Sequence, residues 1–275
     1  MKRLVTAAVG IPLAMAAAFL LPPRWLFLLL VAVVEIQVVE FVRMTRSFAH
    51  SAPRWTLLLL VPAAAVLLSP AMLPPGDGEI SWEYLLAASL ALSVGVGALV
   101  VLGGTDAEEA PAALGVLGFG VVYFSLPVAC LFYLRRIDPW LLVLACVIVW
   151  LGDAAAYYVG TRLGRHKLAE RLSPKKTWEG AVGGLAAAVV GAALWSYWRL
   201  GEVRPALVLL AGATSVGAQL GDLLESMLKR GSGCKDSGAL LPGHGGMMDR
   251  MDAMMFGAPV MAVGIWLVGI DLVAP

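Results

Sequence analysis

Residues that could act on phosphates are concentrated in the segment 221–252, which lies between two apolar segments and holds four Asp, one Glu, two Lys and two Arg. Within it, a spacing of i, i+3, i+4 and i+7 places four polar side chains on one helical face: Asp222, Glu225, Ser226 and Lys229. Carboxylates, a hydroxyl and an ammonium on one face can hold a divalent cation together with an anionic ligand. The alternative interpretation is a solvated helix end with an internal ion pair.

Glycines and basic residues dominate the rest of this segment. Gly231, Gly233 and Gly238 are expected to end the helix, and a Pro-Gly-His-Gly-Gly run follows at 242–246. Glycines let backbone N–H groups approach a phosphate closely, although the segment lacks the G-x-x-x-x-G-K-[ST] pattern of a P-loop. Asp249 and Asp252 are expected in the first turn of the last helix, where carboxylates complement the helix dipole.

Residues 226–252 resemble the signature of a known family along their whole length. The sequence there is S-M-L-K-R-G-S-G-C-K-D-S-G-A-L-L-P-G-H-G-G-M-M-D-R-M-D, which includes K-R-x4-K-D, H-G-G and D-R-x-D. This signature is typical of phosphatidate cytidylyltransferases, also called CDP-diacylglycerol synthases. The resemblance implies a multi-pass membrane enzyme that uses Mg²⁺ to condense CTP with phosphatidic acid, giving CDP-diacylglycerol and pyrophosphate.

The implied reaction brings two anions together, so it requires charge neutralisation and alignment more than a strong base. We expect Asp222 and Asp249 to be the principal ligands of Mg²⁺. Glu225 and Asp252 would be further ligands or would support the principal ones. A second cation could also bind and bracket the attacking and leaving oxygens. Basic side chains would bind the triphosphate and the pyrophosphate. The expected catalytic set is therefore Asp222, Lys229, Arg230, Lys235, Asp249 and Arg250.

A second polar segment, 161–180, contributes to the expected substrate site. Lys175 and Lys176 precede a helix that we expect to begin near Thr177, and a helix N-terminus beside two ammonium groups can bind phosphate. The blocks S-P-K-K-T-W-E-G and G-D-A-A-A-Y also resemble the same family, and the second block contains Asp153. The expected substrate-binding set is Lys175, Lys176, Ser226, His244, Gly245, Gly246 and Asp153.

The composition indicates a membrane protein, because 60% of the 275 residues are hydrophobic and 14% are charged, against about 45–50% and about 25% in soluble domains. Nine apolar segments approach the roughly 20 residues of a membrane span. They are 4–21, 25–42, 55–73, 82–103, 112–134, 139–160, 178–198, 205–228 and 253–271. We therefore predict an all-α polytopic fold of about nine transmembrane helices, with N-terminal helices in 1–110 and a catalytic region in 111–275.

Individual residues inside these spans allow further predictions. Asp153 lies deep in the sixth span, where an ionisable side chain usually lines a polar cavity, although a bond between helices is the alternative. We assign no chemistry to Glu35 and Glu40 in the second span. The methionines near the start of the last helix are expected to face lipid or a lipid cleft: Met247, Met248, Met251, Met254 and Met255.

The distribution of basic residues predicts the orientation. Nine spans with the N-terminus inside place fifteen Lys and Arg on the inner side and five on the outer side, which accounts for all 20. One inner loop, 105–111, opposes the trend with Asp106, Glu108 and Glu109. The active site would then face the cytoplasm from the cell membrane. The expected partners are CTP, phosphatidic acid and the bilayer, and the protein could form a homodimer. The net charge of +1 gives no indication of nucleic-acid binding.

Three other functions are weighed against the cytidylyltransferase. A CDP-alcohol phosphotransferase would carry a D-x3-D pattern within a longer framework, whereas Asp249 and Asp252 form D-x2-D. A CTP-dependent polyprenol kinase, related to this family, would transfer the γ-phosphate and release CDP. An ion transporter would have carboxylates spread through the membrane depth, whereas here they gather at one face beside basic residues.

Overall fold

The protein is helical over most of the residues that the computed structural model describes, which are 12, 14–71, 82–238 and 245–269. Residues 14–20 form a first helical segment. The helices that follow are α2 (Pro23–Met44), α3 (Leu57–Ala71), α4 (Trp82–Leu102), α5 (Ala110–Ile137), α6 (Pro139–Leu163), α7 (Trp178–Leu200), α8 (Pro205–Gly231) and α9 (Met248–Val268), with short 3-10 turns η1 (Thr45–Ser47) and η2 (Arg54–Thr56). The predicted helical class is confirmed.

Six of these helices are long and apolar enough to cross a membrane: α2, α5, α6, α7, α8 and α9. Two further predicted spans form shorter apolar helices, over Arg54–Ser69 and Ala87–Leu102. The first predicted span, 4–21, lies largely outside the described residues. A multi-pass membrane protein is therefore supported, and the count of nine spans stays a prediction.

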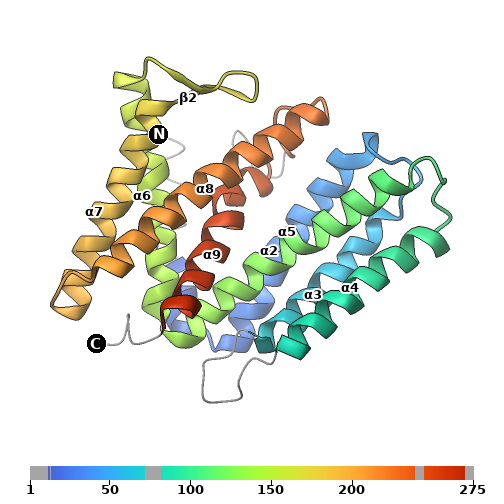
Figure 1. The fold of residues 1–275 in the computed structure, drawn as a ribbon, viewed down its shortest axis with the longest axis horizontal. Helices are drawn as coiled ribbons and strands as arrows, with labels where there is room; N and C mark the ends of the chain where they lie inside the picture. Colours follow the sequence, from blue (N-terminus) through green and yellow to red (C-terminus); the bar gives the residue numbers. More distant parts are fainter. Residues whose placement is uncertain (1–11, 13, 72–81, 239–244, 270–275) are drawn as a thin grey trace.

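A two-stranded hairpin interrupts the helical pattern between α6 and α7. Strand β1 (Lys167–Ala169) pairs antiparallel with β2 (Ser173–Thr177), so that Lys167 lies opposite Thr177 and Ala169 opposite Ser173. The expectation of a purely α-helical chain missed this hairpin, because a short basic segment containing Pro174 lacks the apolar alternation that indicates a strand. The hairpin projects beyond α6 and α7 at one end of the molecule (Figure 1).

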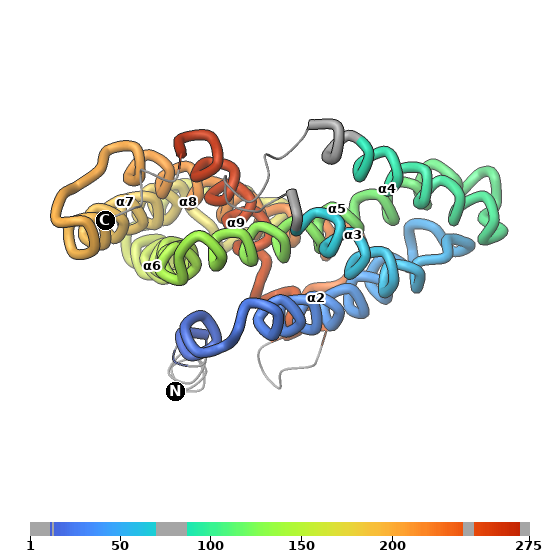
Figure 2. The backbone as a smooth tube through the Cα atoms, turned by 90° about the horizontal axis from the view of Figure 1, so that it is seen from below, coloured from blue at the N-terminus to red at the C-terminus, as the bar shows by residue number. Residues whose placement is uncertain are grey.

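The helices form two packed groups, and α2, α5 and α9 contribute residues to both. One buried cluster joins α5, α6, α7, α8 and α9 with part of α2, and the other joins α2, α3, α4 and α5 with the beginning of α9. Figure 2 shows α6 and α7 on one side of the molecule and α3 and α4 on the other. Met248, Met254 and Met255 are buried in these clusters, so the prediction that they face lipid or a lipid cleft was wrong. Their flexible side chains fill the space between packed helices instead.

Polar residues at one end of the helices hold the connecting segments together. Thr177 caps α7 by accepting a hydrogen bond from the Gly180 N–H at 3.2 Å. Glu109, at the start of α5, accepts bonds from the backbone N–H and the hydroxyl of Ser51 at 2.7 and 2.6 Å. These bonds lower the pKa of Glu109. The acidic loop that opposes the charge trend is thus attached to the segment that follows α2.

Candidate active site

A cavity of about 510 Å³ opens where the hairpin meets α6, α7, α8 and α9. It brings together the two polar segments, which are separated in sequence by most of α7 and α8. Its charged lining consists of Asp153, Lys175, Lys176, Asp222, Asp249, Arg250 and Asp252, and its apolar lining includes Trp150 and Leu168. The cavity therefore joins acidic, basic and apolar surfaces.

Three carboxylates converge beside this cavity, from α8 and α9. Asp222, Glu225 and Asp252 each offer an oxygen that lies within 4.8 Å of the others. The two helices approach closely at Gly221, where a Cβ atom would lie 2.7 Å from the Asp252 carbonyl oxygen. A glycine is therefore required at 221 for Asp252 to reach the α8 carboxylates.

Glu225 shows that this cluster fits a cation. Its side chain is fully buried, and its Oε1 has no hydrogen-bond partner among the described residues. An unsatisfied carboxylate oxygen in the interior is costly unless a positive group neutralises it. Clustered carboxylate oxygens are the ligands that Mg²⁺ and Ca²⁺ prefer, so the cluster is compatible with a divalent cation.

Two lysines bracket the carboxylates. Lys176 Nζ, at the end of the hairpin, lies 2.5 Å from Asp222 Oδ2. Lys229 Nζ lies 2.8 Å from Glu225 Oε2 and 2.6 Å from Asp249 Oδ1. One interpretation of the sequence was a solvated ion pair between Glu225 and Lys229. The pair is present, but it is not solvated, because the Glu225 side chain is buried and the Lys229 side chain is only 12% exposed. The site is therefore a compact array of alternating charges.

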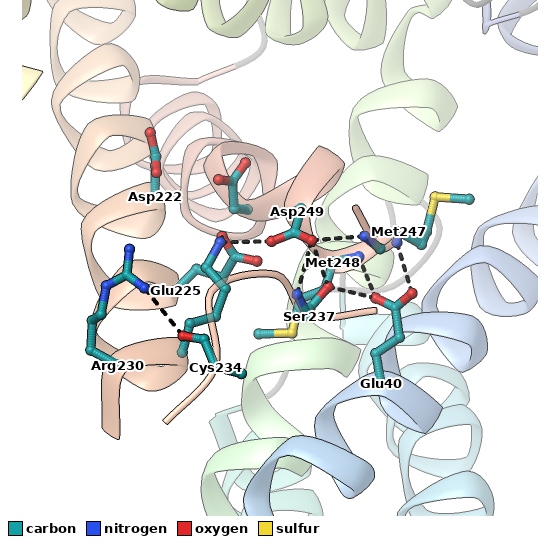
Figure 3. Close-up of polar contacts among 12 residues, drawn as sticks. Glu40, Asp222, Glu225, Arg230, Cys234, Ser237, Met247, Met248 and Asp249 are labelled. Atoms are coloured by element: carbon teal, nitrogen blue, oxygen red, sulfur yellow. Dashed lines mark hydrogen bonds and ion pairs between the residues drawn. The ribbon is translucent and has the colours of Figure 1, made fainter. Parts of the chain in front are cut away.

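Asp249 is held by donors from the loop before α9. Its Oδ2 accepts hydrogen bonds from the Gly246 N–H at 2.7 Å and from the Ser237 N–H and hydroxyl, each at 3.0 Å (Figure 3). Gly245 adopts a φ of +77°, which glycine tolerates and other residues rarely adopt. The Gly246 N–H points at Asp249, so the role predicted for Gly245 and Gly246 in binding substrate stays a prediction.

Glu40 on α2 binds residues next to the site, a contact that the sequence pattern did not reveal. Its Oε1 accepts a hydrogen bond from the Met247 N–H, and its Oε2 accepts from the Met248 N–H and the Ser237 hydroxyl, all at 2.9 Å (Figure 3). The available signal was the presence of two acidic residues, Glu35 and Glu40, in an apolar helix, with Glu40 near its end. It carried no indication of a partner about 200 residues away.

The other predicted site residues lie around the cavity or apart from it. Arg230 Nη1 donates to the Cys234 carbonyl at 3.2 Å, and its Nε to the Leu172 carbonyl at 3.4 Å. Lys235 is exposed and Ser226 is half-buried, and neither lines the cavity. His244 lies outside the described residues. The phosphate-binding roles of these four residues stay predictions.

Comparison with known proteins extends these observations to the whole chain. A model described as the cytidylyltransferase family matches residues 1–268. A protein of Pseudomonas aeruginosa named phosphatidate cytidylyltransferase is 34% identical over 275 residues, covering 98% of this chain and 97% of the relative. Proteins of the same name from Brucella suis and Bacillus subtilis are 38% and 39% identical, over 66% and 54% of this chain and 70% and 56% of the relatives.

Proposed function

The chain belongs to the cytidylyltransferase family, and we propose that it transfers CMP from CTP to phosphatidic acid, giving CDP-diacylglycerol and pyrophosphate for phospholipid biosynthesis. One observation supports this most directly. The cavity places the carboxylates Asp222 and Asp252 beside the lysines Lys175 and Lys176 in a membrane-embedded helical protein. A site that must hold both a cation and phosphates needs both kinds of side chain.

The reaction needs little proton transfer. An oxygen of the phosphatidic acid phosphate attacks the α-phosphorus of CTP, and the bond from this phosphorus to the bridging oxygen of the β-phosphate breaks. The electron pair leaves with pyrophosphate. Because both reactants are anions, the site accelerates the reaction by neutralising and aligning them.

The basic residues of the cavity would perform most of this alignment. Lys175, Lys176 and Arg250 line the cavity and can bind phosphate oxygens. Lys229, held between Glu225 and Asp249, would keep those carboxylates in place and contribute positive charge. The expected contribution of Lys235 to triphosphate binding is part of the same proposal.

The carboxylate cluster would hold the catalytic cation. Among the described residues, Asp222, Glu225 and Asp252 would supply the hard oxygen ligands that Mg²⁺ requires. Such an ion, when bound, would stabilise the negative charge at the reacting phosphorus and at the leaving oxygen. Asp249, which contacts Lys229 through one oxygen, would be a fourth ligand of the cation or would orient the residues around it. The proposal also includes a second cation.

The apolar side of the cavity suits a lipid substrate. Trp150 and Tyr157 line the cavity from α6, and Tyr157 is 57% exposed. Aromatic side chains with a polar edge commonly lie at the membrane interface. The phosphate of phosphatidic acid would reach the lysines while its acyl chains stay in the bilayer beside α6.

The first test is the identity of the products. Purified protein in detergent, given phosphatidic acid, Mg²⁺ and CTP, is expected to move label from both the cytosine ring and the α-phosphate into the lipid phase and to release pyrophosphate. Transfer of γ-label alone into lipid, with CDP in solution, would replace this proposal with the lipid kinase. Cation transport without any lipid product would favour the transporter, which the basic side chains Lys175, Lys176 and Arg250 in the cavity disfavour.

We further propose that the cavity faces the cytoplasm from the cell membrane, as the charge distribution predicts. Cys234 follows α8 beside the site, whereas Cys130 is buried and Cys146 lies within α6. A membrane-impermeant maleimide is expected to label Cys234 in inverted vesicles and to leave it unlabelled in intact cells. Burial raises the pKa of the Cys234 thiol, so labelling should accelerate at mildly alkaline pH, where the reactive thiolate forms.

Two variants control the labelling experiment. Cys234→Ala should abolish the signal, and Asp236→Cys, at an exposed position two residues along, should restore it in that background with the same sidedness. Labelling of either cysteine in intact cells would contradict the proposed orientation.

A further inference from the structure

We propose that Glu40 is a positioning residue, through which α2 holds the beginning of α9 and the loop before it in the geometry that catalysis requires. This inference rests on the proposed function for its effect on rate. Its structural part can be tested without any activity. Glu40 is not among the residues that line the cavity or form the carboxylate cluster, so it would act through other residues.

Glu40 supplies the cap that α9 lacks within its own sequence. Met247 precedes the helix, and no side-chain cap from the neighbouring sequence is present there. The first N–H groups of a helix have no partner inside the helix and need an acceptor from elsewhere. The two oxygens of Glu40 accept the N–H groups of Met247 and Met248 at 2.9 Å. A carboxylate at this position also complements the positive end of the helix dipole.

The same carboxylate connects to Asp249 through one hydroxyl. Ser237 Oγ lies 2.9 Å from Glu40 Oε2 and 3.0 Å from Asp249 Oδ2. The Ser237 backbone N–H donates to Asp249 as well, at 3.0 Å. Asp249 in turn contacts Lys229. Displacement of Glu40 would therefore be transmitted through Ser237 and the first turn of α9 to the charged array.

Gly238 and Gly246 pack closely against Glu40. A Cβ atom at Gly238 would lie 2.7 Å from Glu40 Oε1, and one at Gly246 would collide with Glu40 Oε2 and Ser237 Oγ. Glu40 itself is only 5% exposed. These contacts leave little room for a different side chain at 40 or for side chains at 238 and 246, as expected for a connection that fixes geometry.

The test compares Glu40→Gln with Glu35→Gln in the full-length protein. Glu35 lies on the same helix, and its Oε1 has no hydrogen-bond partner among the described residues. Glutamine retains the size of the side chain but removes the charge and turns one acceptor into a donor facing backbone N–H groups. Hydrogen exchange of the peptides covering 245–256 is expected to accelerate in Glu40→Gln and to remain unchanged in Glu35→Gln.

The kinetic readout separates positioning from loss of folded protein. Turnover at saturating CTP is expected to fall about 10–100-fold in Glu40→Gln, the range that small displacements of catalytic groups produce. The KM for phosphatidic acid should change little, because Glu40 is outside the cavity. Glu40→Asp, which keeps the charge on a shorter side chain, should give an intermediate turnover. Glu35→Gln should match the wild type.

Two results would overturn the inference. One is wild-type turnover together with wild-type exchange at α9 in Glu40→Gln. The other is faster exchange throughout α2 and α5, which would make Glu40 a general packing residue. If the wild-type protein itself formed no CDP-diacylglycerol, the proposed function would fail, whereas the exchange comparison would still decide whether Glu40 orders the start of α9.

Discussion

Asp222→Asn is expected to reduce turnover by about 10²–10³-fold, equivalent to about 3–4 kcal/mol of transition-state stabilisation, while the protein still inserts and folds. Asparagine keeps the shape and one carbonyl oxygen, but a neutral amide binds a hard cation much more weakly than a carboxylate does. Asp222 belongs to the carboxylate cluster and contacts Lys176 at 2.5 Å. Its side chain is 30% exposed, and a partly exposed ion pair contributes only about 0–1 kcal/mol to stability.

Asp249→Asn should lose activity to a similar extent for a partly different reason. Asp249 accepts hydrogen bonds from Lys229, Ser237 and Gly246, so an amide at this position would place a donor against existing donors. Both variants should need more Mg²⁺ to reach half of their maximal rate. The increase should be larger for Asp222→Asn, because Asp222 belongs to the carboxylate cluster whereas Asp249 forms an ion pair with Lys229.

Arg165→Gln is the matched control for both substitutions. The contact seen for Arg165 uses its backbone N–H, which donates to Glu179 Oε2 at 3.1 Å, and the side chain is exposed. This variant should retain most of the wild-type turnover. Retention of more than about a tenth of wild-type turnover by Asp222→Asn at saturating Mg²⁺ would exclude Asp222 as a direct metal ligand, because such a loss corresponds to less than about 1.4 kcal/mol.

Lys229→Met is expected to abolish activity and to destabilise the protein as well. Lys229 neutralises two carboxylates that are almost inaccessible, with side chains 0% exposed for Glu225 and 8% exposed for Asp249. Removing one partner of a buried pair leaves an uncompensated charge and typically costs about 3–5 kcal/mol. The midpoint of thermal denaturation in detergent should therefore fall, together with turnover.

The double variant Lys229→Met/Glu225→Gln distinguishes stability from catalysis. Neutralising Glu225 removes much of the uncompensated charge, so the denaturation midpoint should recover in part, whereas turnover should stay low. Lys167→Met provides the control, because the Lys167 ammonium is exposed and donates to the Pro174 carbonyl at 2.7 Å. Wild-type turnover in Lys229→Met would show that this lysine has no part in the reaction.

Features that depend on neighbouring residues in the sequence could be predicted well. Apolar segments located six helices long enough to cross a membrane, since burial in lipid demands long apolar stretches with internally satisfied backbone bonds. The spacing of Asp222, Glu225 and Lys229 placed them on one helical face. Asp249 lies in the first turn of α9, as expected, whereas Asp252 lies in the second turn. The 226–252 signature identified the family, as the match over 1–268 shows.

Features that depend on packing between distant segments were decided only by the tertiary structure. Helical periodicity describes one helix at a time, so it could not show that Asp252 joins Asp222 and Glu225 while Asp249 turns toward Lys229. Nor could it show that Glu40 contacts residues roughly 200 positions away, or that Met248 and Met255 lie in the core. These contacts lie where α9 packs against α2, α5 and α8. The local sequence determines which face of a helix is polar, but the packing of the helices determines which residues that face contacts.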